Sequence, residues 1–185
     1  MSRPAPSDRI NLSHSSVLLI DDNQQALDML SSIFHGFGVK EQIKCGSASE
    51  GAQILRRRPV DLILVDCVMP DMDGYQLVRW LRRSGLEPNA YVPVVMTAGH
   101  VRRARVAESR DCGANFLITK PFSAAMLLER VLWVARDTRP FLQVGDYLGP
   151  DRRFKTDPYD GHERRADMIR KARFEAEQNE VDQPA

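Results

Sequence analysis

The chain has 185 residues, 43% of them hydrophobic, which is enough for one domain of ordinary size with a buried core and an extension. Its 26 Lys and Arg against 25 Asp and Glu give a formal net charge of +1, so the overall charge does not favour a nucleic acid or a membrane as partner. The apolar run VLLI at 17–20 is too short for a transmembrane helix or a signal-peptide core, and we expect a cytoplasmic protein.

The chain starts with a polar leader. Residues 1–15 contain several Ser and Pro residues and few large apolar side chains, which predicts disorder. The three cysteines, Cys45, Cys67 and Cys112, are odd in number and widely spaced, and no Cys-x-x-Cys pattern occurs. This spacing disfavours a disulfide framework or a zinc site, so we interpret all three as small core residues.

From residue 16 onward, short apolar runs alternate with segments of helical periodicity. Strands are predicted at 16–20, 39–45, 60–65, 92–97 and 116–119, and helices at about 23–37, 48–57, 74–83, 100–111 and 123–136. Apolar strands such as DLILV are typical of a parallel sheet that is covered on both faces. Right-handed crossovers then give a doubly wound, three-layer α/β fold.

Polar side chains stand at the carboxyl ends of four predicted strands. Asp21 and Asp22 follow the first strand, Asp66 follows the third, Thr97 ends the fourth and Lys120 follows the fifth. In a doubly wound fold these ends meet at one edge of the sheet, where ligands bind. Three carboxylates at one edge repel one another unless a hard cation intervenes, and oxygen ligands suit Mg²⁺ together with a phosphoryl group.

Four motifs at these strand ends resemble those of the receiver domain of two-component response regulators. They are LLIDDN, LVDCVMPDMDG, VMTAG and ITKPF, in this order, and the resemblance covers residues 16–137. It implies a CheY-like, flavodoxin-like (βα)5 fold with the parallel sheet order 2-1-3-4-5. It also implies that Asp66 is the phosphoacceptor, whose carboxylate forms an acyl phosphate.

The same resemblance implies a magnesium site. Asp22 and Asp66 would bind Mg²⁺ directly, Asp21 largely through water, and the backbone carbonyl of Val68 would add a further oxygen.

Two further residues would bind the phosphoryl group. Thr97 and Lys120 would hold its oxygens, with the ammonium acting as a mobile positive charge. The bond between Lys120 and Pro121 is expected to be cis, as it is in the family.

The fifth strand departs from the family pattern. Relatives commonly carry Tyr or Phe three residues before the Lys, where this chain has Leu117, so the aromatic switch is altered or absent. Phe116 is expected either to point to an outer face formed with the fourth and fifth helices or to be a buried ring. Arg102 and Arg103, in a locally basic fourth helix, suggest an acidic partner or a subunit contact at this face.

Residues 138–185 are too few and too polar for a common output domain. We expect a turn-rich strap and then a solvated helix. The strap contains the pattern Tyr-x-Gly-x-(Asp or Glu)-Arg-Arg twice, starting at Tyr147 and Tyr159, twelve residues apart. Each copy ends in an arginine pair that can bind a carboxylate. The four arginines are Arg152, Arg153, Arg164 and Arg165.

The resemblance favours a response regulator that is a signalling switch and not an enzyme. Its partners would be a sensor histidine kinase or a histidine phosphotransfer protein, a downstream protein and possible second copies of the chain, without direct contact to nucleic acid. Two alternatives stay open. The chain could pass its phosphoryl group on to a histidine as a phosphorelay carrier, or DMDG at 71–74 could belong to a haloacid-dehalogenase-type phosphatase. The second is disfavoured because the strand ends at Asp66, before Pro70.

Overall fold

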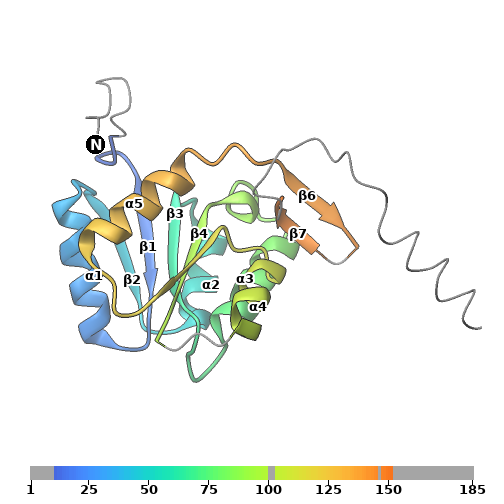
Figure 1. The fold of residues 1–185 in the computed structure, drawn as a ribbon, viewed down its shortest axis with the longest axis horizontal. Helices are drawn as coiled ribbons and strands as arrows, with labels where there is room; N and C mark the ends of the chain where they lie inside the picture. Colours follow the sequence, from blue (N-terminus) through green and yellow to red (C-terminus); the bar gives the residue numbers. More distant parts are fainter. Residues whose placement is uncertain (1–10, 100–102, 146, 152–185) are drawn as a thin grey trace, which may run out of the picture. The chain divides into compact units, whose positions relative to one another are not determined.

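The computed structural model describes residues 11–99, 103–145 and 147–151, without the side chains of 103–105. Five parallel strands in this part of the chain form one sheet in the order β2-β1-β3-β4-β5, which confirms the predicted topology (Figure 1). The strands are β1 (Ser16–Ile20), β2 (Glu41–Cys45), β3 (Leu62–Asp66), β4 (Val94–Ala98) and β5 (Phe116–Thr119). The helices are α1 (Gln24–Gly36), α2 (Ala48–Arg57), α3 (Gly74–Arg83), α4 (Arg103–Asp111) and α5 (Ala124–Ala135), with a short 3₁₀ turn η2 (Asn89–Tyr91).

Helix starts are set by side chains that accept hydrogen bonds from the first free backbone amides. The Asn23 side chain accepts from the amides of the first turn of α1, and Ser123 does the same for α5. Asp73 and Gln76 form a capping box at the start of α3. The predicted ranges 23–37 and 123–136 therefore include capping residues that lie just outside the helices.

Three strands begin two residues later than predicted, at Glu41, Leu62 and Val94. The apolar side chains before them are still buried, as at Val39, Val60 and Val92, although they are not paired in the sheet. Hydrophobicity extends the apparent strands because it reports burial, while a strand needs a neighbour that exchanges backbone hydrogen bonds. The third and fourth strands also run one residue further, to Asp66 and Ala98.

Two apolar layers hold the helices on the sheet. Helices α1 and α5 cover one face through residues such as Leu27, Phe34 and Leu127, while α2 and α3 cover the other through residues such as Leu55 and Leu77 (Figure 1). The buried strands β1, β3 and β4 supply side chains to both layers alternately. The three cysteines are buried and free, as expected for core residues.

The residues after α5 form a β-hairpin where the sequence predicts a turn-rich strap. Strands β6 (Phe141–Val144) and β7 (Tyr147–Pro150) pair antiparallel, and Gly145 between them has a φ of +56°. That conformation favours glycine in a two-residue hairpin turn. A Gly-Asp pair between two short apolar runs is a hairpin signal, so the sequence contained the information that the strap interpretation missed.

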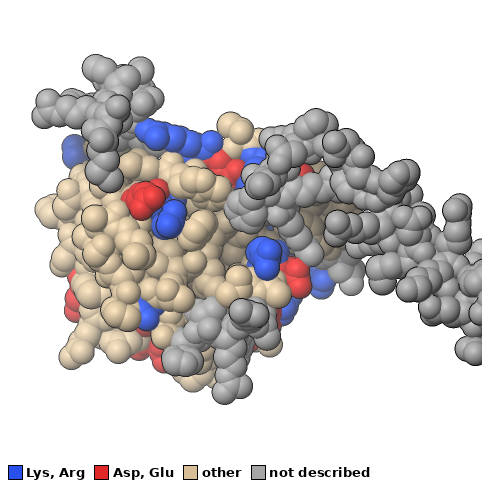
Figure 2. All heavy atoms as spheres, in the orientation of Figure 1, with Lys and Arg blue, Asp and Glu red and all other residues tan. Residues whose placement is uncertain are grey.

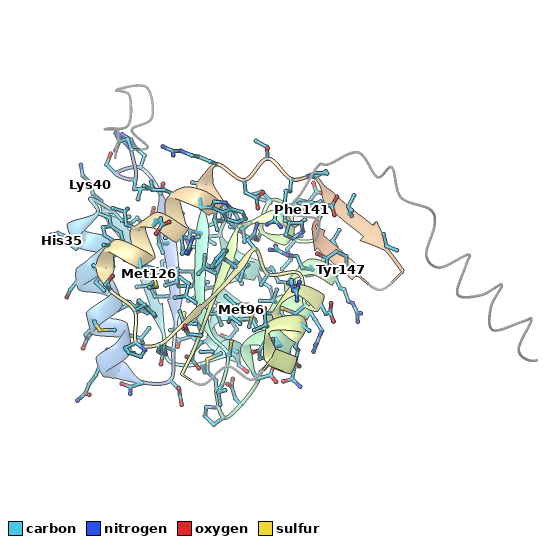
Figure 3. All side chains as sticks on the ribbon, viewed as in Figure 1. His35, Lys40, Met96, Met126, Phe141 and Tyr147 are labelled. Carbon is cyan, nitrogen blue, oxygen red and sulfur yellow. The ribbon has the colours of Figure 1, made fainter. Side chains whose placement is uncertain are left out.

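The hairpin packs on the edge of the domain where the strands of the main sheet begin. Phe141 contacts Tyr91 of η2 at a ring-centroid distance of 5.4 Å, and Phe141 and Tyr147 lie beside the domain in Figure 3. Arg139 anchors the base of the hairpin, donating to the Asp151 carbonyl at 2.9 Å and pairing with Asp137 at 2.7 Å. Hairpin and receiver-like domain thus belong to one compact unit. The predicted boundary between 137 and 138 stays a prediction.

The leader up to residue 10, Arg102 and the tail from Arg152 onward, including the predicted helix, lie outside the described residues. On the face drawn in Figure 2, acidic and basic side chains of the described part are interspersed and form no large patch of one sign. Within the described ranges, no helix is both long and apolar enough to cross a bilayer.

Candidate functional site

The carboxyl ends of four parallel strands meet at one edge of the sheet and bring the predicted polar residues together. Asp21 directly follows β1, Asp66 is the last residue of β3, and Lys120 directly follows β5. Thr97 lies in β4 in register with Asp66, so the two residues stand on neighbouring strands at the same level. The strand order therefore places residues that are up to 99 positions apart in one small site.

Asp66 lies at the centre of this site, with 10% of its side chain exposed. Lys120 Nζ donates to its Oδ1 at 2.6 Å, and the backbone amide of Val68 donates to its Oδ2 at 2.7 Å. The Thr97 hydroxyl donates to Oδ1 over a longer distance of 3.4 Å. Asp66 is thus held in one orientation by charge and by backbone, with Thr97 beside it.

Asp21 lies on the other side of Lys120 and is buried. Lys120 Nζ donates to Asp21 Oδ2 at 2.7 Å, and the backbone amide of Asn23 donates to Oδ1 at 2.9 Å. Asp22, the next residue, is exposed. The pair of acids therefore consists of one side chain fixed in the site and one directed to solvent.

Lys120 links the two buried acids, and its pKa reflects them. Burial of the ammonium lowers the pKa, but the hydrogen bonds and negative charges of Asp21 and Asp66 together outweigh that effect and raise the pKa of Lys120 above its ordinary value. Lys120 accordingly stays charged through the whole physiological range. The peptide bond between Lys120 and Pro121 is cis, as the resemblance implies.

The loop after Asp66 returns to the strand end so closely that only glycine fits at position 74. A Cβ atom on Gly74 would stand 2.2 Å from the backbone oxygen of Asp66 and 3.2 Å from the Cα of Cys67. The Gly74 amide also donates to the Cys67 carbonyl at 3.2 Å. The start of α3 is thereby fixed against the backbone that carries Asp66.

The donors at this edge are suited to a hard cation. Among the described residues, Asp21, Asp22 and Asp66 carry three negative charges against the one positive charge of Lys120, which leaves two negative charges uncompensated. All of these donors are oxygens, the type that Mg²⁺ prefers. In the described part of the chain, no three acidic, His or Cys side chains are grouped as a ready metal cage, because the Lys120 ammonium lies between the two buried acids.

The residues predicted at the rim and the switch position lie in three different environments. Val68 is 66% exposed and stands beside Asp66. Leu117 packs against the apolar layer under α2 and α3, while the Phe116 ring faces α5, 5.5 Å from the Trp133 ring and covered by the Arg130 guanidinium. Phe116 is therefore a half-buried ring under α5, in place of a free outer-face aromatic. Arg103 begins α4, and its side chain, like the whole of Arg102, lies outside the described residues.

Both aspartates of the DMDG segment cap helices. Asp73 caps α3, and Asp71 accepts a hydrogen bond from the Ser49 amide in the first turn of α2 at 3.0 Å. Neither residue ends a strand, which the phosphatase alternative requires of its first aspartate. The structure therefore gives DMDG a structural role, and Asp66 is the strand-end carboxylate.

Asp71→Ala is expected to lower the free energy of unfolding by about 0.5–1 kcal/mol at pH 7, the usual cost of losing a helix cap. Hydrogen bonding to Ser49 lowers the pKa of Asp71 to about 2. Because the folded pKa is below the unfolded value, the contribution is complete above about pH 4 and disappears as the pH falls towards 2. Denaturant titrations of both proteins between pH 7 and pH 2 measure this difference. A difference that persists at the lowest pH would contradict the cap.

Residues 17–132 match the sequence profile of the response regulator receiver domain family. The chain is 32% identical over 138 residues to the transcriptional regulatory protein GltR of Pseudomonas aeruginosa, a match that covers 72% of the chain and 54% of that protein. It is 27% identical over 126 residues to histidine kinase 1 of Arabidopsis thaliana, covering 64% of the chain and only 10% of the kinase. The chain thus spans about half the length of one of these relatives and a small part of the other.

A solved structure shares the fold of the described domain. The response regulator receiver domain protein (CheY-like) from Methanospirillum hungatei JF-1 is similar with a TM-score of 0.58 and 26% identity, covering 63% of the chain and 90% of that structure.

Proposed function

Because the chain belongs to the response regulator receiver domain family, we propose that it is a response regulator of a two-component or phosphorelay system that is phosphorylated on Asp66. One observation supports Asp66 above the other acids. It is the strand-end carboxylate that is held at once by the Lys120 ammonium, the Val68 amide and the Thr97 hydroxyl. Phosphorylation on aspartate is general for receiver domains, and these donors hold the Asp66 side chain in one orientation.

The chemistry follows from these contacts. A carboxylate oxygen of Asp66 forms a bond to phosphorus while the bond from phosphorus to the donor's leaving group breaks, which gives an acyl phosphate. The transferred group carries negative charge on its outer oxygens. Lys120 and Thr97 are placed to stabilise those oxygens by charge and hydrogen bonding.

Receiver domains generally bind Mg²⁺ at their acidic pocket. In this chain Asp21, Asp22 and Asp66, with the backbone carbonyl of Val68, would hold the ion. Mg²⁺ supplies positive charge that neutralises the incoming phosphoryl oxygens. Lys120 would then exchange its contact with one of the acids for a contact with the phosphoryl group, as a flexible ammonium can.

Receiver domains interact with histidine kinases or phosphotransfer proteins, and such a protein would be the phosphoryl donor here. We assign the chain a role as a cytoplasmic signalling switch and not as an enzyme. Its output would be a protein contact made by the surface around α4, α5 and β5, the strand that contains Phe116, or by the tail. A homodimer through the same surface is included in this proposal.

Incubation with acetyl phosphate and Mg²⁺ is expected to add one phosphoryl group to the protein, as measured by intact-protein mass spectrometry. EDTA in excess over Mg²⁺ is expected to abolish the addition, because the two excess negative charges at the site then repel the phosphoryl donor. Addition of Mg²⁺ after EDTA should restore it. An unmodified wild-type protein in saturating Mg²⁺ would refute the proposed function.

A phosphorelay carrier is the second candidate. The observation that favours it is the similarity to part of a histidine kinase, since a receiver-like segment within a kinase can serve as a relay station. Incubation of the phosphorylated protein with a candidate histidine phosphotransfer protein distinguishes the two. Transfer of the phosphoryl group to that protein's histidine supports a carrier, and retention of the phosphoryl group on Asp66 supports a terminal switch.

A further inference from the structure

The hairpin of β6 and β7 is held against the domain by a buried arginine. Arg82 of α3 is 2% exposed and donates to the backbone carbonyls of Gly113 at 3.0 Å and Ala90 at 2.8 Å. The Phe141 ring of β6 lies over the Arg82 guanidinium at 5.0 Å and also meets the Tyr91 ring edge to face. An aromatic ring attracts a cation placed over its face. The hairpin is therefore preorganised, and its two edges have a fixed orientation.

The register of the hairpin decides which backbone groups of β6 face outward. The Asp151 amide donates to the Pro140 carbonyl at 2.9 Å, which makes these two residues a hydrogen-bonded pair. Hydrogen-bonded and non-hydrogen-bonded pairs alternate along an antiparallel ladder, so Leu142 bonds with β7 and its two neighbours do not. The amides and carbonyls of those neighbours, Phe141 and Gln143, therefore point away from β7.

The outer edge of β7 is closed to a further strand. The Leu148 carbonyl packs on the turn between α4 and β5, where a Cβ on Gly113 would stand 2.4 Å from the carbonyl oxygen. A Cβ on Gly149 would stand 2.7 Å from the Gly113 Cα. Pro150 has no backbone N–H, and its carbonyl accepts from the Tyr147 hydroxyl at 2.6 Å. The hairpin can therefore be extended at β6 and not at β7.

The outer edge of β6 is open and unprotected. Figure 1 shows β7 between β6 and α3, and no described residue bonds to the outward backbone groups of Phe141 or Gln143. The strand FLQV contains no charged residue and no Pro, which commonly protect edge strands against pairing. The edge strand β2 of the main sheet, in contrast, carries Glu41 and Lys44. The β6 edge is therefore suited to pairing with another strand.

The β6 edge is complementary to itself. Two β6 strands that pair antiparallel about a two-fold axis at Leu142 place Phe141 of each strand opposite Gln143 of the other. Each of these outward residues then exchanges both of its backbone hydrogen bonds with the partner strand. The two Leu142 side chains, each 36% exposed, face each other across the axis and bury apolar area. Because the strand is uncharged, no like charges meet in this arrangement.

We propose that the outer edge of β6 is a docking surface for β6 of a second copy of this chain. The two hairpins then form one continuous antiparallel sheet in the order β7-β6-β6-β7. This interface differs from the surface around α4, α5 and β5, and it needs no phosphoryl group on Asp66, so it stands or falls separately from the proposed function. So short a strand pair buries less than the roughly 1,200 Å² of a lasting interface, and the dimer is weak and reversible.

Sedimentation velocity of the full chain, without acetyl phosphate, tests the surface. The wild type should shift from monomer towards dimer as its concentration rises. Gln143→Pro should dimerise at least about tenfold more weakly, because it loses an outward amide while the hairpin keeps its bonds to β7. Met126→Asp, at an exposed apolar residue of α5, should dimerise as the wild type does. A wild type that stays monomeric at its highest concentration, or a dimer that Met126→Asp disrupts and Gln143→Pro does not, would overturn the proposal.

A cysteine at the axis tests the register. Leu142→Cys places two thiols opposite each other in a non-hydrogen-bonded pair, where Cα atoms stand about 4.5 Å apart, so air oxidation should give a covalent dimer. Val144→Cys is the matched control, because Val144 is more exposed, at 69%, but lies off the axis, too far from its own copy for a disulfide. The wild type, whose three cysteines are buried, gives the background. Equal dimer yields from the two variants, or no dimer from Leu142→Cys, would contradict the proposed pairing.

Discussion

Asp66→Asn is expected to abolish phosphorylation by acetyl phosphate in the presence of Mg²⁺. The amide has no nucleophilic carboxylate oxygen, and the other acids of the site are either engaged by backbone, as Asp21 is, or exposed, as Asp22 is. The substitution keeps the shape of the side chain and can still accept from the Val68 amide. The measurement is the fraction of protein that gains one phosphoryl group over time.

The matched control is Asp71→Asn, in the loop that follows Asp66. Asp71 caps α2 and does not contact the Lys120 ammonium, so this variant should accept the phosphoryl group at the wild-type rate. Circular dichroism of both variants establishes that they are folded. Two results would contradict the assignment of Asp66 as the phosphoacceptor. One is an Asp66→Asn protein that still gains a phosphoryl group, and the other is a folded Asp71→Asn protein that gains none.

Gly74→Ala is expected to have the second largest effect. The added Cβ meets the Asp66 backbone oxygen at 2.2 Å, and backbone on both sides cannot give way as a flexible side chain can. The strain should lower the free energy of unfolding by about 1–3 kcal/mol. It should also slow phosphorylation roughly tenfold to a hundredfold, because small displacements of a reacting group are costly.

Gly36→Ala provides the comparison, since a Cβ at Gly36 meets no atom within 4 Å. Gly36 is the last residue of α1. The Gly36→Ala variant should raise the free energy of unfolding by no more than about 1 kcal/mol and leave phosphorylation unaffected. Urea titrations and initial labelling rates are measured for both variants. If Gly74→Ala is as stable and as active as Gly36→Ala, the close approach does not constrain the site.

Much of the fold could be predicted because its signals are local. The helices at 48–57 and 74–83 and the strands at 16–20 and 116–119 have the predicted bounds, since apolar periodicity and capping residues lie within each segment. The strand ends then located Asp21, Asp66, Thr97 and Lys120 at one edge. Parallel strands in a doubly wound sheet share the direction of their carboxyl ends, so this step needs only the order of the elements.

Other features depended on partners far away in the chain. In the sequence, Asp71 resembles part of a phosphatase signature. Only the fold shows that its carboxylate accepts a hydrogen bond from the Ser49 amide. Phe116 has two possible orientations until the Trp133 ring of α5 covers it. Lys120 was expected at the phosphoryl group, and only the folded chain shows that it bridges two acids.

The sequence by itself therefore determined the class of fold and the residue types of the site, because the spacing of apolar residues and the polar residues after each strand are local features of the sequence. The tertiary structure alone decided that Tyr147–Pro150, in the first copy of the repeated motif, is a strand packed on the Gly113 turn. Arg82 reads as an ordinary basic residue in the last turn of α3, and Gly149 as an ordinary turn glycine. Their roles arise when the hairpin meets the Gly113 turn, because close backbone contact and the burial of a charge are properties of surfaces brought together by folding.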